Sequence, residues 1–186
     1  GANFAGQTQI MHLSGEVGGG RSITGFDWFK YCRSSQTVTN VTINMGHTSS
    51  GTLTTNLAGN FSDTPTTVVN NLTSYSIPNS PISGWLASPT FTSNFQYDGS
   101  RNMILEVLAT CGPNGGNNGI WSGYWRVNPN AGIARAAYTV PTYAGATSPI
   151  TATFFYDTVY YYLIDTSEAQ SLWYDMGIRT PQFLDI

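Results

Sequence analysis

Charged side chains are scarce in this chain: Asp, Glu, Lys and Arg together make up 9% of its 186 residues. Soluble domains usually carry about 25%. A free monomer depends on surface charge to stay in solution and apart from its copies. A surface made mainly of hydroxyls, amides and aromatic rings therefore indicates that something covers the folded chain: other subunits, a sugar polymer or attached glycans.

The composition also excludes several classes of protein. The net charge of −3 and the scattered basic residues leave no basic stripe for a nucleic acid. The most apolar stretches, 103–109 and 160–164, are far shorter than the roughly 18 residues of a membrane-spanning helix. An apolar fraction of 40% is enough for a packed core. The length suits one domain over residues 1–186.

Strand-like segments separated by Gly, Pro and Asn turns predict an all-β fold, a single β-sandwich of jelly-roll type with few short helical turns. Residues alternate clearly within 37–45, and 102–110 is apolar on both faces, which predicts a central strand. A long segment, 151–164, predicts one strand or two with a bend near Asp157. The other expected strands are 8–13, 23–31, 66–69, 74–77, 120–127, 134–140, 171–174 and 182–186. Short helical turns are expected at 56–60 and 166–170.

The chain carries two cysteines, Cys32 and Cys111. In a secreted protein such a pair predicts one disulfide, with two free thiols as the alternative. The sequence begins at Gly1 without Met, as after removal of a secretory signal, although a cloning scar or an excised domain would look the same. Neither cysteine has a CxxC partner, and the only histidines are His12 and His47, so no metal or cofactor is predicted.

No catalytic constellation is predicted, and we expect a protein that is not an enzyme. A hydrolytic triad would rest on His12 or His47, and the sequence has no G-x-S-x-G motif, so a surface or hydrogen-bonded histidine is the simpler interpretation. Glu106 lies inside an apolar strand and becomes a glycosidase candidate only opposite a second carboxylate. The simpler interpretation is a strand residue that faces solvent or pairs with Arg126 or Arg135.

One aromatic group indicates a sugar-binding surface. Trp121, Tyr124 and Trp125 follow the Gly- and Asn-rich loop 112–119. Aromatic faces beside amides suit a pyranose ring, which has an apolar face and a rim of hydroxyls. Packing in the core is the alternative interpretation for these three residues.

A second aromatic group predicts a subunit interface. Three consecutive tyrosines on one strand place rings on both faces of a sheet, so one side needs a cover. Tyr and Trp are also enriched in interface hot spots. The candidate interface comprises Tyr160, Tyr161, Tyr162, Leu172, Trp173, Tyr174 and Met176.

Three sequons, at Asn40, Asn60 and Asn71, permit N-glycosylation. In a chain this rich in Asn and Thr, some sequons arise by chance.

Several strand and turn motifs resemble secreted bacterial β-sandwich domains of cell-surface and extracellular proteins. The motifs are Asn44-Met45-Gly46-His47-Thr48-Ser49, Asn56-Leu57-Ala58-Gly59-Asn60-Phe61, Thr66-Thr67-Val68-Val69, Trp85, Tyr97-Asp98-Gly99 and Asn102-Met103-Ile104-Leu105-Glu106-Val107. The resemblance covers about residues 7–126. It implies export and a non-enzymatic scaffold or adhesive role, and in its light His47 is expected in a turn that closes a strand.

These observations predict a secreted structural protein, a subunit of an extracellular filament or surface layer whose partners are copies of itself. Terminal segments 1–13 or 171–186 would complete the sheet of a neighbour, unless both are edge strands of their own domain. The alternative function is a carbohydrate-binding or lectin-like adhesion domain with a polysaccharide partner.

Overall fold

The computed structural model describes residues 4–30, 36–77, 84–111, 127–129, 133–141, 147–152, 154–156 and 158–162. Within them the fold is all-β, as predicted. The strands are β1 (Phe4–His12), β2 (Arg21–Lys30), β3 (Gln36–Thr48), β4 (Thr66–Ile77), β5 (Gly84–Ala87), β6 (Phe95–Tyr97), β7 (Asn102–Cys111), β8 (Val127–Pro129), β9 (Ala136–Pro141), β10 (Thr147–Ala152), β11 (Phe154–Tyr156) and β12 (Thr158–Tyr162). The helices are one four-residue turn, α1 (Ser14–Val17), and the 3-10 turn η1 (Ala58–Asn60).

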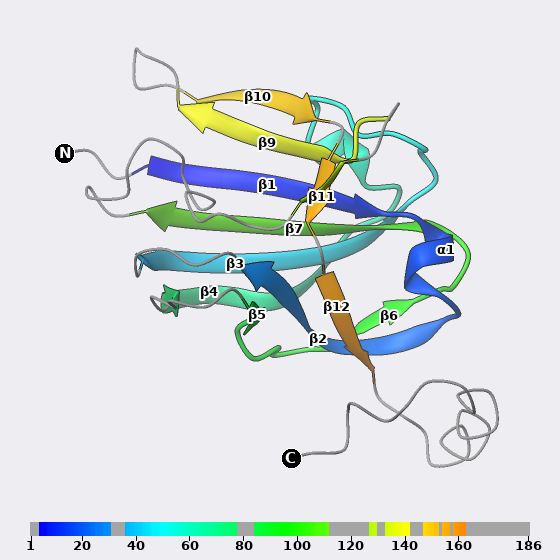
Figure 1. The fold of residues 1–186 in the computed structure, drawn as a ribbon, viewed down its shortest axis with the longest axis horizontal. Helices are drawn as coiled ribbons and strands as arrows, with labels where there is room; N and C mark the ends of the chain where they lie inside the picture. Colours follow the sequence, from blue (N-terminus) through cyan, green and yellow to red (C-terminus); the bar gives the residue numbers. More distant parts are fainter. Residues whose placement is uncertain are drawn as a thin grey trace.

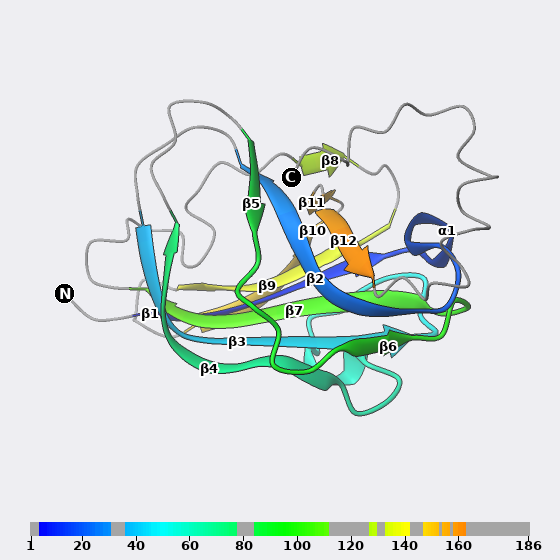
Figure 2. The same ribbon diagram turned by 90° about the horizontal axis from the view of Figure 1, so that it is seen from below.

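Six strands form the large sheet, in the order β10-β9-β1-β7-β3-β4 (Figure 1). All five pairings between its neighbouring strands are antiparallel. A small sheet, β12-β2-β5, lies over one face of the large sheet, with β6 also paired to β2, and β11 pairs with β8 (Figure 2). The prediction that 102–110 is a central strand is confirmed, since β7 pairs with β1 on one side and β3 on the other.

The main core lies between the two sheets. It joins residues of β1, β3, β4 and β7 to Ile23, Phe26 and Trp28 of β2. Each such side chain, fully buried, contributes roughly 1.5–3 kcal/mol. This apolar layer fixes which side of the large sheet faces inward.

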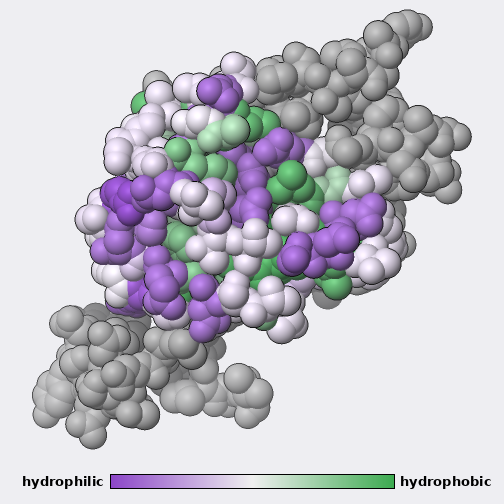
Figure 3. Space-filling view, turned by 180° about the vertical axis from the view of Figure 1, so that it is seen from behind, coloured by the Kyte–Doolittle hydropathy of each residue, from purple (hydrophilic) through white to green (hydrophobic). Residues whose placement is uncertain are grey.

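The opposite, outer face of the large sheet carries a second, smaller core. Two of its residues, Leu53 and Leu57, come from the segment between β3 and β4. They pack with residues of the large sheet: Met11, Ile104 and Ala137. Gly46 allows the close approach, because a Cβ there would lie 2.6 Å from the ring of Phe61. Seen from behind, this side of the molecule shows separate hydrophobic patches between hydrophilic ones (Figure 3).

The pairing of β3 with β4 contains irregularities in register that were not predicted from the sequence. Segments 66–69 and 74–77 were expected as two strands but belong to one, β4. Its pairing with β3 shifts register on either side of Ile43, and Asn40 and Asn71 have positive φ angles of 52° and 45°. Asn tolerates this conformation better than most residues. The shifts also explain why the consecutive residues Val68 and Val69 are both buried.

The expected strand 151–164 is wrong as one element, whereas the alternative of two strands divided near Asp157 agrees with β11 and β12, which lie on either side of that residue. β10, β11 and β12 belong to three different sheets. The short strands β5 and β6 and the turn α1 were missed. The expected turn at 56–60 contains η1, whereas 166–170, 171–174 and 182–186 lie outside the described residues.

Candidate functional site

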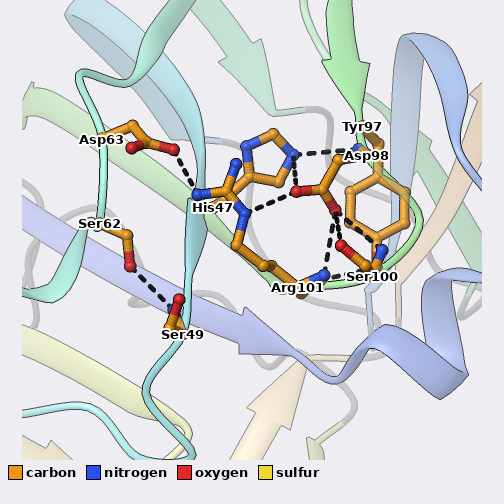
Figure 4. Close-up of polar contacts among 8 residues, drawn as sticks. All are labelled: His47, Ser49, Ser62, Asp63, Tyr97, Asp98, Ser100 and Arg101. Atoms are coloured by element: carbon orange, nitrogen blue, oxygen red, sulfur yellow. Dashed lines mark hydrogen bonds and ion pairs between the residues drawn. The ribbon is translucent and has the colours of Figure 1, made fainter.

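Within the described residues, a surface cluster of charged side chains surrounds the turn between β6 and β7 (Figure 4). One oxygen of Asp98, Oδ1, accepts hydrogen bonds from the backbone N–H groups of Ser100 (2.8 Å) and Arg101 (3.0 Å) and from the Ser100 hydroxyl (3.1 Å). Gly99 has a φ of 77°, and a Cβ there would lie 2.2 Å from the backbone nitrogen of Gly20. The turn therefore requires glycine at this position.

Arg101 extends the cluster to a neighbouring loop. Its Nε donates to Oδ2 of Asp98 at 2.6 Å, and its Nη1 donates to Asp63. Burial alone raises the pKa of Asp98, but the hydrogen bonds from Arg101 and Ser100 outweigh it and hold the pKa well below its usual range. The same two carboxylates raise the pKa of Arg101.

His47 also belongs to this cluster. The backbone N–H of Asp98 donates to its Nε2 at 3.1 Å, so this ring nitrogen is unprotonated. The ring packs against Phe95 and Tyr97, with centroids 5.0 and 5.8 Å away. Burial lowers the pKa of His47, although the nearby Asp98 opposes the shift. The expectation of a turn is wrong, because His47 lies within β3 and its ring supports the next turn in space.

This geometry does not form a hydrolytic triad. The nearby serines have other partners: the Ser100 hydroxyl donates to Asp98, the N–H of Ser49 donates to the Ser62 hydroxyl, and the N–H of Ser62 donates to the carbonyl of His47. The hydrogen bonds and ion pairs of this cluster connect β3, the loop after η1 and the β6–β7 turn. The cluster therefore acts as a non-covalent link between these three parts of the chain.

A second cluster surrounds Glu106 on the outer face of the large sheet. Its side chain is buried, and three amides donate to the carboxylate, each at 2.7 Å: Gln7 and Gln9 to Oε1, and Asn44 to Oε2. Gln9, Glu106 and Asn44 are register neighbours across β1, β7 and β3. A carboxylate only accepts, so it fixes the orientation of all three amides.

The network continues outward from these amides. Gln9 donates a second bond to the carbonyl of Leu57 and accepts one from Asn60. On the other side, the Thr67 hydroxyl donates to Asn44. Through these bonds one buried carboxylate ties the segment carrying η1 to four strands of the sheet.

Both simpler interpretations of Glu106 are therefore wrong where they can be checked. The residue does not face solvent, and it does not pair with Arg135. Arg126 lies outside the described residues. The signal in the sequence was the set of polar residues inside otherwise apolar strands, but nothing local links Gln9 to Glu106.

Arg135 instead anchors α1. It is buried, donates twice to the carbonyl of Met11 and forms a two-pronged ion pair with Glu16. Burial alone raises the pKa of Glu16, but hydrogen bonds from Arg135 and the N–H of Leu13 lower it. His12 is buried beside this pair, and desolvation, helped by Arg135, lowers its pKa to about 4. This favours the neutral ring, as expected for a histidine of structural role.

The predicted interface and sugar-binding residues are only partly placed. The backbone of β12, at the edge of the small sheet, sets three of the interface candidates opposite β2: Tyr160 opposite Phe26, Tyr161 opposite Gly25 and Tyr162 opposite Ile23. The remaining interface candidates, Leu172, Trp173, Tyr174 and Met176, lie outside the described residues, as do the sugar-binding candidates Trp121, Tyr124 and Trp125. These two predictions stay predictions.

The other sequence candidates divide in the same way. Cys111 ends β7, whereas Cys32 lies outside the described residues, so the disulfide stays a prediction. Of the three sequons, Asn40 and Asn71 are exposed. Asn60 is buried and its side chain bonds Gln9, so the folded chain has no room for a glycan there.

Among the described residues, no three His, Cys, Asp or Glu side chains are placed to share a metal ion. In the same part of the chain, no helix has the length and apolarity to cross a membrane. Comparison with protein-family models, curated proteins and solved structures found no match for this chain.

Proposed function

We propose that this chain is a secreted, non-enzymatic structural subunit that associates with copies of itself through an edge of its large sheet. The finer architecture, a β-sandwich of jelly-roll type, belongs to the same proposal. The contacts of His47, Glu106 and Arg135 support a structural role, because each is engaged in holding strands and loops together.

The observation that carries the proposal is the difference between the two ends of the large sheet. β10 has six residues with Pro149 among them, and proline cannot donate to an added strand. β4 has twelve residues, no proline and no charge. Edge strands are normally protected by such charges or prolines, because their free backbone groups invite pairing. β4 therefore has neither of these protections.

The described surface supports the same proposal. Its exposed positions carry mostly Thr, Ser, Asn and Gly. Among residues whose side chains are described, the exposed acidic ones are Glu16, Asp63 and Asp98, and no basic one is equally exposed. Little charge repulsion therefore opposes contact between copies.

Light scattering over a wide range of protein concentrations, together with negative-stain microscopy, tests the proposal. We expect dimers or larger regular assemblies that persist at high salt, since uncharged contacts are not screened. A monodisperse monomer at every concentration and salt would show that the chain is no assembly subunit.

A further inference from the structure

We infer that residues 72–77 of β4 pair antiparallel with the same residues of a second copy, across a two-fold axis. This inference rests on the proposed self-association and names its contact. It joins the two large sheets edge to edge into one continuous sheet.

The first half of β4 is already covered along its outer edge. The carbonyl of Val68 accepts from the N–H (2.7 Å) and hydroxyl (3.1 Å) of Thr92, and that of Thr67 accepts from the hydroxyl of Ser93. After Asn71 and the register shifts the strand turns, and its end rises toward the small sheet (Figure 2). In the described part of the chain, no strand pairs with the outer side of 72–77.

This segment is held rigidly at its own sheet. Leu72 and Tyr75 pack against the main core, and the Tyr75 hydroxyl donates to the carbonyl of Ala87 in β5. A strand that is already ordered loses little conformational entropy when a second strand is added. The outer edge of residues 72–77 and the contacts that hold this segment in place therefore suit a strand to which a second strand is added.

The chemistry of the segment favours a second copy as the occupant. Its residues carry no charge, so self-pairing sets no like charges opposite one another. Thr73, Ser74 and Ser76 are exposed, and hydroxyl side chains pair favourably across strands. Pairing to the other end of the sheet is impeded at Pro149 of β10.

The symmetry fixes the partners. A two-fold axis that relates antiparallel edge strands stands perpendicular to the sheet, so the residue on the axis pairs with itself. With Ser74 on the axis, Ser74 faces Ser74; with Tyr75 there, Ser74 faces Ser76. Either contact is self-complementary and closes as a dimer, so a filament needs a second contact elsewhere.

Paired charge substitutions test this contact. Ser74→Lys/Ser76→Lys places like charges across the axis in both registers, and Ser74→Glu/Ser76→Glu does the same with the opposite sign. We expect each variant alone to dimerise about a hundredfold more weakly than the native chain, because like charges face each other. An equimolar mixture of the two should recover the dimer. Thr55→Lys/Thr64→Lys, at exposed positions between β3 and β4, is the control and should dimerise normally.

A cross-link provides a second measurement. Ser74→Cys/Ser76→Cys should give a covalent dimer on mild oxidation in either register, because residue 74 faces residue 74 or residue 76 of the second copy. Thr55→Cys/Thr64→Cys, away from the axis, should not. Native self-association that survives both charge variants would overturn the β4 contact and leave the proposed function standing. A native chain that never associates would overturn the proposed function itself.

Discussion

The buried carboxylate of Glu106 and the exposed carboxylates around Arg101 use similar hydrogen bonds in opposite surroundings. Glu106 is 5% exposed and is held by three amides rather than by a cation among the described residues. In the surface cluster, the side chains of Arg101 and Asp63 are 33% and 56% exposed. Water competes for every bond there and salt screens the charges. Hydrogen bonds of similar length therefore contribute differently to stability at the two sites.

Removing the buried acceptor is the largest expected effect. Glu106→Leu leaves three amides without their acceptor, and we expect the free energy of unfolding to fall by about 2–4 kcal/mol. Urea unfolding followed by fluorescence measures it.

Glu106→Gln is the matched control for this loss. Asn44 can turn its amide, accept from the new side chain and donate to Thr67, so the expected cost is only about 1 kcal/mol. Equal losses in the two variants would contradict this and show that the network requires the carboxylate itself.

Lowering the pH is expected to have the next largest effect on stability. The pH dependence distinguishes the buried His12 from the half-buried His47. The pKa of His12 is about 4 in the folded chain and 6.5 in its ordinary range. Between these values the unfolded chain takes up a proton that the folded chain refuses, so stability falls as the pH falls. From pH 7 to pH 5 the expected loss is about 2 kcal/mol.

Unfolding of His12→Gln and His47→Gln at several pH values measures this loss. Burial of His12 beside Arg135 makes it the main source, so His12→Gln should flatten the profile. The pKa of His47 is also lowered, but Asp98 opposes the shift, so His47→Gln should keep most of the slope. A steeper contribution from His47 would reverse the comparison.

The smallest effect is expected at the surface. Arg101→Ala removes the bonds to Asp98 and Asp63, but solvent replaces them, so the loss of stability should be well below that of Glu106→Leu. Urea unfolding at low and high salt should show the difference from the native chain shrinking as salt rises. A loss that is large and independent of salt would mean that the cluster is effectively buried.

The sequence predicted a strand correctly where the alternation of apolar and polar residues could be read within that strand alone. Alternation in 37–45 and the two apolar faces of 102–110 predicted β3 and the central place of β7. At Asn70 and Asn71 the pattern breaks because a bulge shifts the faces, and one strand looked like two. β5 and β6 are too short for a period to appear.

The polar clusters could not be derived in the same way. Glu106 meets Gln9 across 97 residues and Asn44 across 62. The strand order that unites them has no local signature, because β1, β7 and β3 are adjacent only in the folded sheet. Glu106 could be singled out from its apolar surroundings, whereas its partners could not.

If the proposed function holds, the position of β1 has a mechanical consequence. All nine residues of β1 pair with β7, and β9 pairs with its other side. Traction on the amino end of β1 runs along the strand, while its ladder of hydrogen bonds lies across it. The hydrogen bonds are then loaded together in shear, instead of breaking one after another from the end of the strand. A domain pulled from this end should hold until the whole strand slips.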